Sequence, residues 1–258
     1  MANAAVAYTN LADSATITAS SFLTLAPPSR LQNRHVKRKW YGKNGTTEYL
    51  TIDHGSSVSI DTVMLAGLNL TAAGLTRIRI SDTDTTGQTG EIYDSSSAAG
   101  RVDPNYGYLI ILIGAAVSGR YMRIDLSDTG LTRIGAGRLF TGVRTAVGIN
   151  YSPGAARAWV DPTIKVPGTW GQTFVDSRDK YRTMDVSFEW LTEAEKNGFV
   201  ESIDLTHGES GDFLFVSDTA STNLGRDSIW GFIDGNTPVI QPYTTDVFSK
   251  AYRLRERL

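Results

Sequence analysis

The chain has 258 residues, a formal net charge of −2 and no cysteine. So small a charge gives no overall field that would hold the protein on a polyanion. The lack of cysteine excludes disulfides, thiolate metal sites and thiol nucleophiles, and it is typical of a protein that folds in a reducing cytoplasm. The charge is unevenly spread: residues 1–145 hold 14 Lys and Arg against 11 Asp and Glu, and the remainder hold 11 against 16. The resulting difference, +3 against −5, suggests two modules or a polar stacking direction in an assembly.

Targeting and membrane signals are weak. The first ten residues, MANAAVAYTN, lack a basic segment followed by an apolar one, so we expect no signal peptide. The longest apolar run, Leu109–Val117, covers about half of a membrane crossing. It predicts a strand buried on both faces rather than a membrane insertion.

Short segments with a period of two recur along the first half of the chain. In YMRIDL, for example, Met122, Ile124 and Leu126 share one face and polar residues take the other. This alternation is typical of antiparallel strands with one solvated face. Turn residues separate the segments, as at 43–45 and 127–130. The strand-like segments of this half are EYLTIDHG, VSIDTVMLAGLNL, TRIRISD, GYLIILIG and RYMRIDLSD.

One segment has helical periodicity. In LTEAEKNGFVESI, Thr192 precedes Glu195 by three residues, which is the spacing of a capping box. Phe199 and Ile203 lie one turn apart on a common face. We therefore expect one short helix near residues 192–203, crossing the end of a second sheet.

The boundary between two modules is expected near residues 141–148. Before it, IGAGRLFTG is typical of a last strand returning to the first sheet; after it, a Pro-, Gly- and Trp-rich stretch leads into a new alternating region. The sequence thus predicts a mainly β protein with two β-sandwich modules, one over 1–145 and an antiparallel one with a short helix over 146–258.

No pattern indicates catalysis or a cofactor. The three histidines are far apart, there is no G-x-S-x-G elbow, and the glycines of IGAGRLFTG precede β-type residues instead of a helix. HGESG, 207–211, is better explained as a loop leaving the helix. No pair of carboxylates stands out among 27 acidic residues. We expect a protein that is not an enzyme and holds no cofactor.

The segment Asp82–Gly87 partly matches a calcium-binding loop. Asp82 and Asp84 alternate with hydroxyls before a glycine, as in a calcium loop. The twelfth position is Tyr93, where a bidentate carboxylate is required, and Glu91 falls two residues short. An ordinary hairpin turn is the favoured interpretation, and a metal at Asp82 and Asp84 stays open.

A basic segment, NRHVKRKW, precedes the first long strand. Arg34, Lys37, Arg38 and Lys39 surround a histidine and end on Trp40. Basic side chains interleaved with an aromatic are found in nucleic-acid grooves, but also on solvated or subunit-facing loops. With a near-neutral chain, we favour the loop and an assembly contact over ligand contact, and expect no nucleic acid.

Ordered motifs make the first half similar to discoidin-type, galactose-binding-like jelly-roll domains of phage virion proteins. They are a Trp before the first long strand, then EYLTIDHG, VSIDTVMLAGLNL, GRYMRIDLSD and IGAGRLFTG. The resemblance implies that Trp40 anchors the core. It also implies that the four basic residues of the preceding segment lie on a loop facing solvent or a neighbouring subunit.

The second half resembles the C-terminal portion of such phage tail proteins, through DKYRTMDVSFEWL, the helix, DFLFVSD, SIWGFIDG and KAYRLRERL. The whole chain is therefore similar to a distal-tail-like, tail-tip or baseplate protein of a long-tailed (siphovirus-type), non-contractile phage. This implies a structural role in the virion, synthesis in the host cytoplasm, and partners that are other tail proteins and copies of itself in a sixfold or threefold ring. Arg253, Arg255 and Arg257 are expected either to dock on a neighbour or to lie on a solvated terminal strand.

Two other functions are alternatives to the structural role. Jelly rolls also bind sugars, so the alternative is a carbohydrate-binding module that contacts a host surface glycan. The first half supplies aromatic residues for stacking on sugar rings, although most of them are expected in the core: Trp40, Tyr41, Tyr93, Tyr106 and Tyr108. A tail-associated hydrolase is the third and least favoured possibility.

Overall fold

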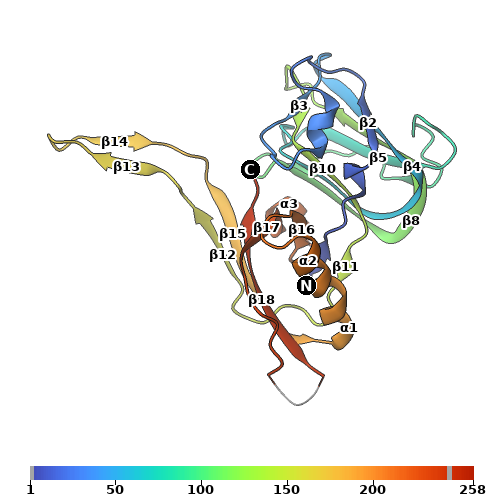
Figure 1. The fold of residues 1–258 in the computed structure, drawn as a ribbon. Helices are drawn as coiled ribbons and strands as arrows, with labels where there is room; N and C mark the ends of the chain where they lie inside the picture. Colours follow the sequence, from blue (N-terminus) through green and yellow to red (C-terminus); the bar gives the residue numbers. More distant parts are fainter. Residues whose placement is uncertain (1–2, 243–245) are drawn as a thin grey trace. The chain divides into compact units, whose positions relative to one another are not determined.

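The computed structural model describes residues 3–242 and 246–258 (Figure 1). It contains two seven-stranded antiparallel sheets, two short two-stranded sheets and one helical segment of several turns. The predicted fold class, mainly β with a single principal helix, is confirmed. Within the described residues, no helix is long and apolar enough to cross a membrane.

The chain divides into two compact units. The first contains Met1–Val147, Phe213–Trp230 and Leu258, and the second contains Gly148–Asp212 and Gly231–Arg257. The first break lies two residues after the expected boundary at residue 145. Residues 213–230, predicted to lie in the second module, belong to the first unit because their apolar side chains pack there.

Two strands of 20 residues build the first unit, β4 (Thr47–Ala66) and β8 (Tyr108–Ser127). They pair antiparallel along their length, with register shifts between Asp53 and Val58 and between Ile60 and Thr62. Extra residues at such shifts bend a strand pair. Each long strand therefore contributes to both layers of a sandwich. The sequence suggested two separate strands in each of these stretches.

Each half of the long strand pair is hydrogen-bonded to a different set of neighbouring strands. The first half of β4, with the second half of β8, pairs with β2 (Thr16–Ala19) and with β5 (Leu75–Ser81), and β6 (Tyr93–Asp94) adds to β5. The other half pairs with β10 (Arg138–Gly142) and β7 (Val102–Asp103). The two halves of this one bent, seven-stranded sheet form the two layers of the predicted jelly roll.

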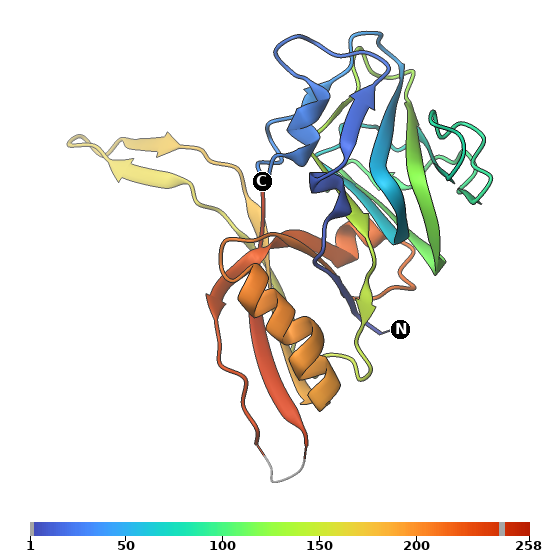
Figure 2. The same ribbon diagram turned by 45° about the vertical axis from the view of Figure 1, so that its right-hand side comes forward.

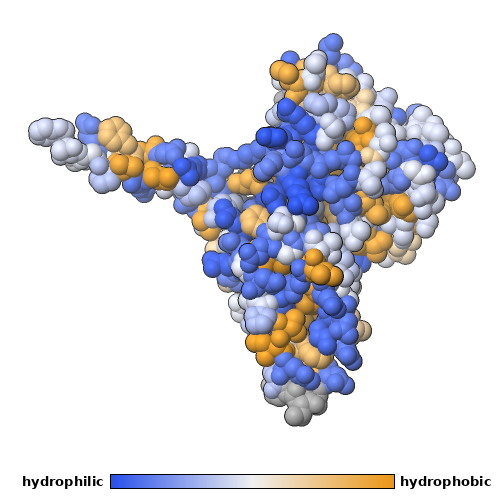
Figure 3. Space-filling model, in the orientation of Figure 1, coloured by the Kyte–Doolittle hydropathy of each residue, from blue (hydrophilic) through white to orange (hydrophobic). Residues whose placement is uncertain are grey.

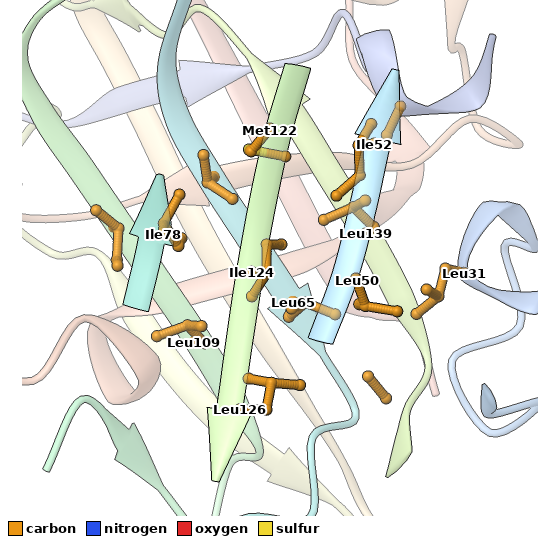
Figure 4. Close-up of a cluster of buried hydrophobic side chains, with 14 of the residues drawn as sticks. Leu31, Leu50, Ile52, Leu65, Ile78, Leu109, Met122, Ile124, Leu126 and Leu139 are labelled. Carbon is orange, nitrogen blue, oxygen red and sulfur yellow. The ribbon is translucent and has the colours of Figure 1, made fainter. Parts of the chain in front are cut away.

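The core of the first unit lies between these layers (Figure 4). Alternate residues of β4, β5 and β8 point inward, as the period of two predicts. Buried aliphatic side chains from both layers meet there: Leu50, Ile52, Leu65, Ile78, Leu109, Met122, Ile124, Leu126 and Leu139. Trp40, in β3 (Trp40–Tyr41), is fully buried in the same cluster, which confirms its role as a core anchor.

A second apolar cluster covers the other face of β4, β8 and β10. Met64, Tyr108 and Phe140 pack there against residues of β1 (Ala5–Ala7), β16 (Phe213–Val216) and the start of β17 (Ser228–Asn236). Residues 109–113 therefore lie between two clusters, as expected for the apolar run. Gly114, Ala115 and Ala116 are exposed, so the doubly buried part is shorter than predicted.

Shorter elements complete the first unit. Arg138 in β10 is buried, forms a bidentate ion pair with Asp13 and lies over the ring of Trp230. The remaining elements are 3-10 turns at Leu11–Asp13 and Pro28–Gln32, β9 (Gly135–Ala136), which pairs with β3, β11 (Thr145–Ala146), which pairs with β1, and α3 (Leu224–Asp227).

The second unit is built on β15 (Tyr181–Leu191), which pairs with β12 (Ala156–Val160) on one side and β18 (Phe248–Glu256) on the other. β17 pairs with the other edge of β18, so the strand order is β17-β18-β15-β12. A separate hairpin of β13 (Ile164–Pro167) and β14 (Thr173–Asp176) lies between β12 and β15 in the chain.

The helix lies on this sheet (Figure 2). It runs through α1 (Glu193–Glu195), a π-helical turn and α2 (Glu201–Thr206). The predicted capping box of Thr192 and Glu195 is present. Phe199, Val200 and Ile203 are buried. The rings of Phe199 and Phe188 pack edge to face, with their centroids 6.3 Å apart. HGESG forms the turn that leaves the helix, as predicted.

Two ion pairs are buried in the second unit. Arg182 donates to Glu256 at 2.6 Å, and Lys250 donates to Asp204 at 2.6 Å and to Asn236 at 2.8 Å. Buried charges are tolerated only when they are paired in this way. They join the strands β15 and β18 to each other and to the helix.

In the first unit, the backbone at Gly137 lies very close to the backbone at Val36, and a substitution there tests this packing. A Cβ on Gly137 would lie 1.9 Å from the carbonyl oxygen of Val36, which no small shift can relieve. We expect Gly137→Ala to lower the free energy of unfolding by about 1–3 kcal/mol, as overpacking does. Gly114→Ala, where a Cβ meets nothing within 4 Å, is the matched control. Urea denaturation measures both, and equal midpoints would contradict the expectation.

Candidate ligand-binding site

The outer face of the first unit carries an array of charged side chains. Residues of β4, β5 and β8 that alternate with the core residues point away from the sandwich. Register places Tyr49 opposite Asp125, Asp125 opposite Arg77, and Arg123 opposite Arg79. Charged residues from three strands therefore gather on one face, because their neighbours in sequence are needed in the core.

The array is held together by ion pairs. Arg77 forms a bidentate pair with Asp94, with Nε to Oδ1 at 2.9 Å and Nη2 to Oδ2 at 2.5 Å. Asp125 accepts from two arginines, from Arg79 Nη2 at 2.6 Å and from Arg123 Nε at 2.8 Å. Bidentate and shared pairs of this kind fix the planes of the guanidinium groups. The face is thus preorganised.

Tyr49 and Arg123 form a stacked pair on this face. The Arg123 guanidinium lies 3.6 Å from the centroid of the Tyr49 ring, and the tyrosine is 37% exposed. Stacking of arginine on an aromatic face is a favourable cation–π contact. The two planar groups form a flat, partly exposed platform beside Asp125.

A cavity of about 220 Å³ opens beside the array. Its lining combines charged groups, hydroxyls and an apolar edge at Leu75, which is 42% exposed. Thr47 and Ser127 share a hydrogen bond of 3.2 Å across the strands at this position. The lining residues are Thr47, Leu75, Arg77, Arg79, Ser97, Asp125, Leu126 and Ser127. We call this cavity the outer-face pocket.

Arg79 is the most buried charged residue of the pocket, at 7% exposure. The turn that follows β5 covers it: Gly90, at φ +60, lies so close that a Cβ there would be 3.0 Å from Arg79 Cγ. The Arg79 side chain donates to the carbonyl oxygen of Gln88 and to Asp125. Its Nε is buried and has no hydrogen-bond partner among the described residues.

The carboxylates of the turn at 82–91 are occupied by local donors. The Thr86 hydroxyl and backbone amides lower the pKa of Asp84 to about 2, and the hydroxyl of Ser81 is the largest cause that lowers the pKa of Glu91. Glu91 also accepts from the backbone amides of Asp82 and Thr83. Among the residues described, no group of three His, Asp or Glu is placed to hold a metal ion. The stretch is a hairpin turn, the favoured alternative.

The basic segment lies on the surface of the first unit. Arg34, Lys37 and Arg38 are exposed, and Lys39 is half-buried, so that burial lowers its pKa. Val36, between them, belongs to the second apolar cluster. The structure therefore places the segment on a loop anchored by Val36 and Trp40. Whether a subunit binds there stays a prediction.

Arg253 and Arg255 lie on β18 of the second unit, and Arg257 directly follows the last residue of this strand, Glu256. Arg253 is exposed, 3.7 Å from Asp185, while Arg255 lies over the ring of Tyr181 at 4.1 Å. Arg257 donates to the carbonyl oxygen of Ser210 at 2.7 Å. Because β18 is paired on both edges, the terminal segment is an internal strand of its own sheet, and it is not a free arm.

The aromatic residues considered for sugar stacking are mostly internal. Trp40 and Tyr108 are buried, and Tyr41, Tyr93 and Tyr106 are half-buried. Burial also raises the pKa of Tyr93. The more exposed Tyr49, on the charged face, was not selected from the sequence.

The charged array was also missed. Alternation in TRIRIS and YMRIDL predicts that the arginines lie on a solvated face, but it does not predict which residues of other strands they will meet. The missing information is the register of β5 against β8 and of β6 against β5, which brings residues 77, 79, 94 and 125 together. The sequence does contain a signal: charged residues alternate with apolar ones in both segments. TRIRIS carries two arginines, and YMRIDL carries an arginine and a carboxylate.

Comparison with known proteins concerns half of the chain. No protein-family model matches the sequence, and no curated protein matches it either. Over 53% of this chain, the structure is similar to a mutant lectin-binding domain of lectinolysin solved with Lewis b, at 12% identity and a TM-score of 0.42, covering 96% of that domain. A Streptococcus pneumoniae fucose-binding module shows 14% identity, a TM-score of 0.40 and coverage of 52% of this chain and 98% of the module.

A third similar structure is a chitosan-binding module from a chitosanase/glucanase of Paenibacillus sp. IK-5, with 22% identity and a TM-score of 0.40. The match covers 53% of this chain and all of that module. Each of these matches covers about half of this chain and nearly all of the domain or module to which it is similar.

The Arg77–Asp94 pair makes the first unit sensitive to acid. The hydrogen bond from Arg77 lowers the pKa of Asp94 from 3.8 to about 2. A carboxyl with a lowered pKa contributes stability above its unfolded pKa and loses it as the pH falls through the folded value. We expect wild type to exceed Asp94→Asn in urea midpoint above about pH 5, and the difference to vanish between about pH 4 and pH 2. A pH-independent difference would contradict this.

Proposed function

We propose that the first unit is a saccharide-binding module and that the outer-face pocket is its binding site. The observation that carries the proposal is the preorganised array of Arg77, Arg79 and Asp125 in the wall of a cavity of about 220 Å³. A fold alone does not determine function, so the argument rests on this site.

The groups of the pocket suit sugar hydroxyls. Guanidinium groups donate in a fixed plane, and a carboxylate accepts, so that neighbouring hydroxyls of a sugar can bind to both. Tyr49 and the apolar edge at Leu75 provide surface for the C–H side of a ring. Thr47, Ser97 and Ser127 add hydroxyls that both donate and accept. Because the pairs already fix the arginines, little side-chain entropy is lost on binding.

A second function, assembly into a multi-subunit particle, is favoured by the hairpin β13–β14. An isolated two-stranded hairpin is at best marginally stable in water. Every residue of both strands is exposed in this hairpin, and hydrophobic residues lie along it (Figure 3). Trp170, at its tip, is 91% exposed. Exposed apolar surface of this kind is typical of a protein–protein contact.

The hairpin has one predominantly apolar face. Register places Val166 opposite Phe174, and Ile164 two residues away on the same face. Lys165 and Val175 occupy the other face. We propose that the apolar face packs on a neighbouring copy and that repetition of this heterologous contact closes a ring. A structural component of a phage tail tip, as the sequence resemblance implies, would use the hairpin in this way.

Saccharide binding is tested with the full-length protein on a glycan array, followed by calorimetry with the glycan that binds best. Arg77→Gln removes charge-assisted hydrogen bonds and is expected to weaken binding about tenfold or more. Arg178→Gln, on the exposed Arg178–Asp176 pair of the second unit, is the matched control and should bind as wild type. The proposal fails if no glycan binds above background, or if both variants bind equally well.

Assembly is tested by light scattering and negative-stain imaging of the purified chain. We expect a threefold or sixfold ring, and we expect Phe174→Asp to yield monomers because it places a charge on the apolar face. Val175→Asp, one residue along on the opposite face, should leave the ring intact. A wild-type protein that stays monomeric, or equal disruption by both substitutions, would contradict assembly through this face.

A further inference from the structure

The segment that follows β6 forms a β-bulge against β5, beside the outer-face pocket. The backbone amide of Ser95 donates to the carbonyl oxygen of Ile78. The next bridge along the two segments joins Ala98 to Thr76. Residues 96–97 therefore lie opposite a single residue of β5. One extra residue of this kind bends a strand and re-aims the side chains beside it.

The bulge turns Ser97 to the side of the pocket. Asp94 lies on the outer face, where it pairs with Arg77, and strict alternation from Asp94 would place Ser97 on the inner side. The extra residue shifts the alternation by one position, so that Ala98 bridges to the buried Thr76. Ser97 is exposed and lines the outer-face pocket.

Ser96, the first residue of the bulge, has a strained backbone. Its φ is 56°, and in the described part of the chain it is the sole residue other than glycine with a positive φ. A residue with a Cβ keeps this conformation only where the surrounding structure imposes it, and such positions cluster at functional sites. The amide of Ser96 donates to Asp94 Oδ1 at 2.9 Å, and its carbonyl oxygen accepts from Arg101 Nη1 at 3.0 Å. Both backbone groups of Ser96 are thus held.

Arg101 joins the bulge to β5. Its Nη1 donates to the carbonyl oxygen of Thr76 in β5 at 3.0 Å as well as to that of Ser96. Its Nη2 donates to the carbonyl oxygen of Ser95 at 2.6 Å. Because the guanidinium group is planar and charged, these hydrogen bonds fix the bulge strongly and in one geometry.

The hydroxyl of Ser97 differs from the other hydroxyls of the pocket. Those of Thr47 and Ser127 share a hydrogen bond of 3.2 Å. Among the described residues, the Ser97 hydroxyl has no hydrogen-bond partner. It can donate one hydrogen bond and accept others without breaking an existing one.

From the bulge and its anchoring we infer that Ser97 contacts the bound saccharide and selects for one of its hydroxyls, and that Arg101 is the positioning residue that holds Ser97 in place. This inference rests on the proposed saccharide-binding function and names a specificity-determining residue of its site. A hydroxyl on a short side chain of a fixed backbone loses little conformational freedom on binding. A sugar that lacks the matching hydroxyl leaves this contact unmade and binds more weakly.

Sugars that lack single hydroxyls test the contact with the full-length protein. Calorimetry compares methyl galactoside, methyl glucoside and methyl mannoside, and then the monodeoxy analogues of the one that binds most tightly. In the wild type, at least one analogue should bind about threefold to tenfold more weakly than its parent, as expected for one lost hydrogen bond. In Ser97→Ala, the parent sugar and that analogue should bind equally. Ser56→Ala, exposed on β4 and outside the pocket lining, is the matched control and should behave as wild type.

A double-mutant cycle tests the role of Arg101. Arg101→Lys keeps the positive charge but loses the planar set of donors. If Arg101 acts through Ser97, this substitution weakens binding of the parent sugar in the wild-type background and has no further effect on Ser97→Ala. A general loosening of the fold would instead weaken binding in both backgrounds. Thermal unfolding checks that each variant is folded, and Ser97→Ala, a surface substitution, decides the contact by itself.

The outcomes separate this inference from the saccharide-binding proposal. Equal affinity of the wild type and Ser97→Ala for the parent sugar overturns the contact, while saccharide binding stands. Equal weakening by Arg101→Lys in both backgrounds overturns the positioning role. An absence of binding to every sugar, on the glycan array and in calorimetry, overturns both proposals.

Discussion

The bend in the β4–β8 pair is the constraint on which the first unit depends. Two strands of 20 residues stay hydrogen-bonded to each other while passing from one layer of the sandwich to the other. The register shifts after Asp53 and after Ile60 permit this change of layer. As a result, one continuous pair supplies both walls of the core and, through the alternate residues of its outer half, the charged face that bears the pocket.

The two proposed surfaces follow from different physical situations. The outer-face pocket is polar and preorganised, because ion pairs between neighbouring strands hold its arginines before any ligand arrives. The hairpin β13–β14 is apolar and exposed, and a contact there gains from removal of Ile164, Val166 and Phe174 from water. One surface thus suits a small polar ligand, and the other suits a protein partner.

Much of the fold could be predicted from local sequence, and the site could not. Alternation identified the strands, the Thr192–Glu195 spacing gave the start of the helix, and the resemblance to jelly-roll domains correctly placed Trp40 in the core. Local patterns do not report register, so the meeting of Arg77 with Asp94 and of Arg79 with Asp125 was invisible. Nor do they show that residues 213–230 pack with the first unit, since that depends on contacts more than 100 residues apart in the chain.

The discontinuous first unit has a consequence for synthesis on the ribosome. Met64, Tyr108 and Phe140 are translated long before Leu214, Val216 and Trp230, which cover them. A nascent chain therefore exposes this apolar sheet surface until residue 230 has emerged. Gene fragments ending near codon 147 would carry the same uncovered surface permanently, and their products would tend to aggregate even though the inner sandwich is complete.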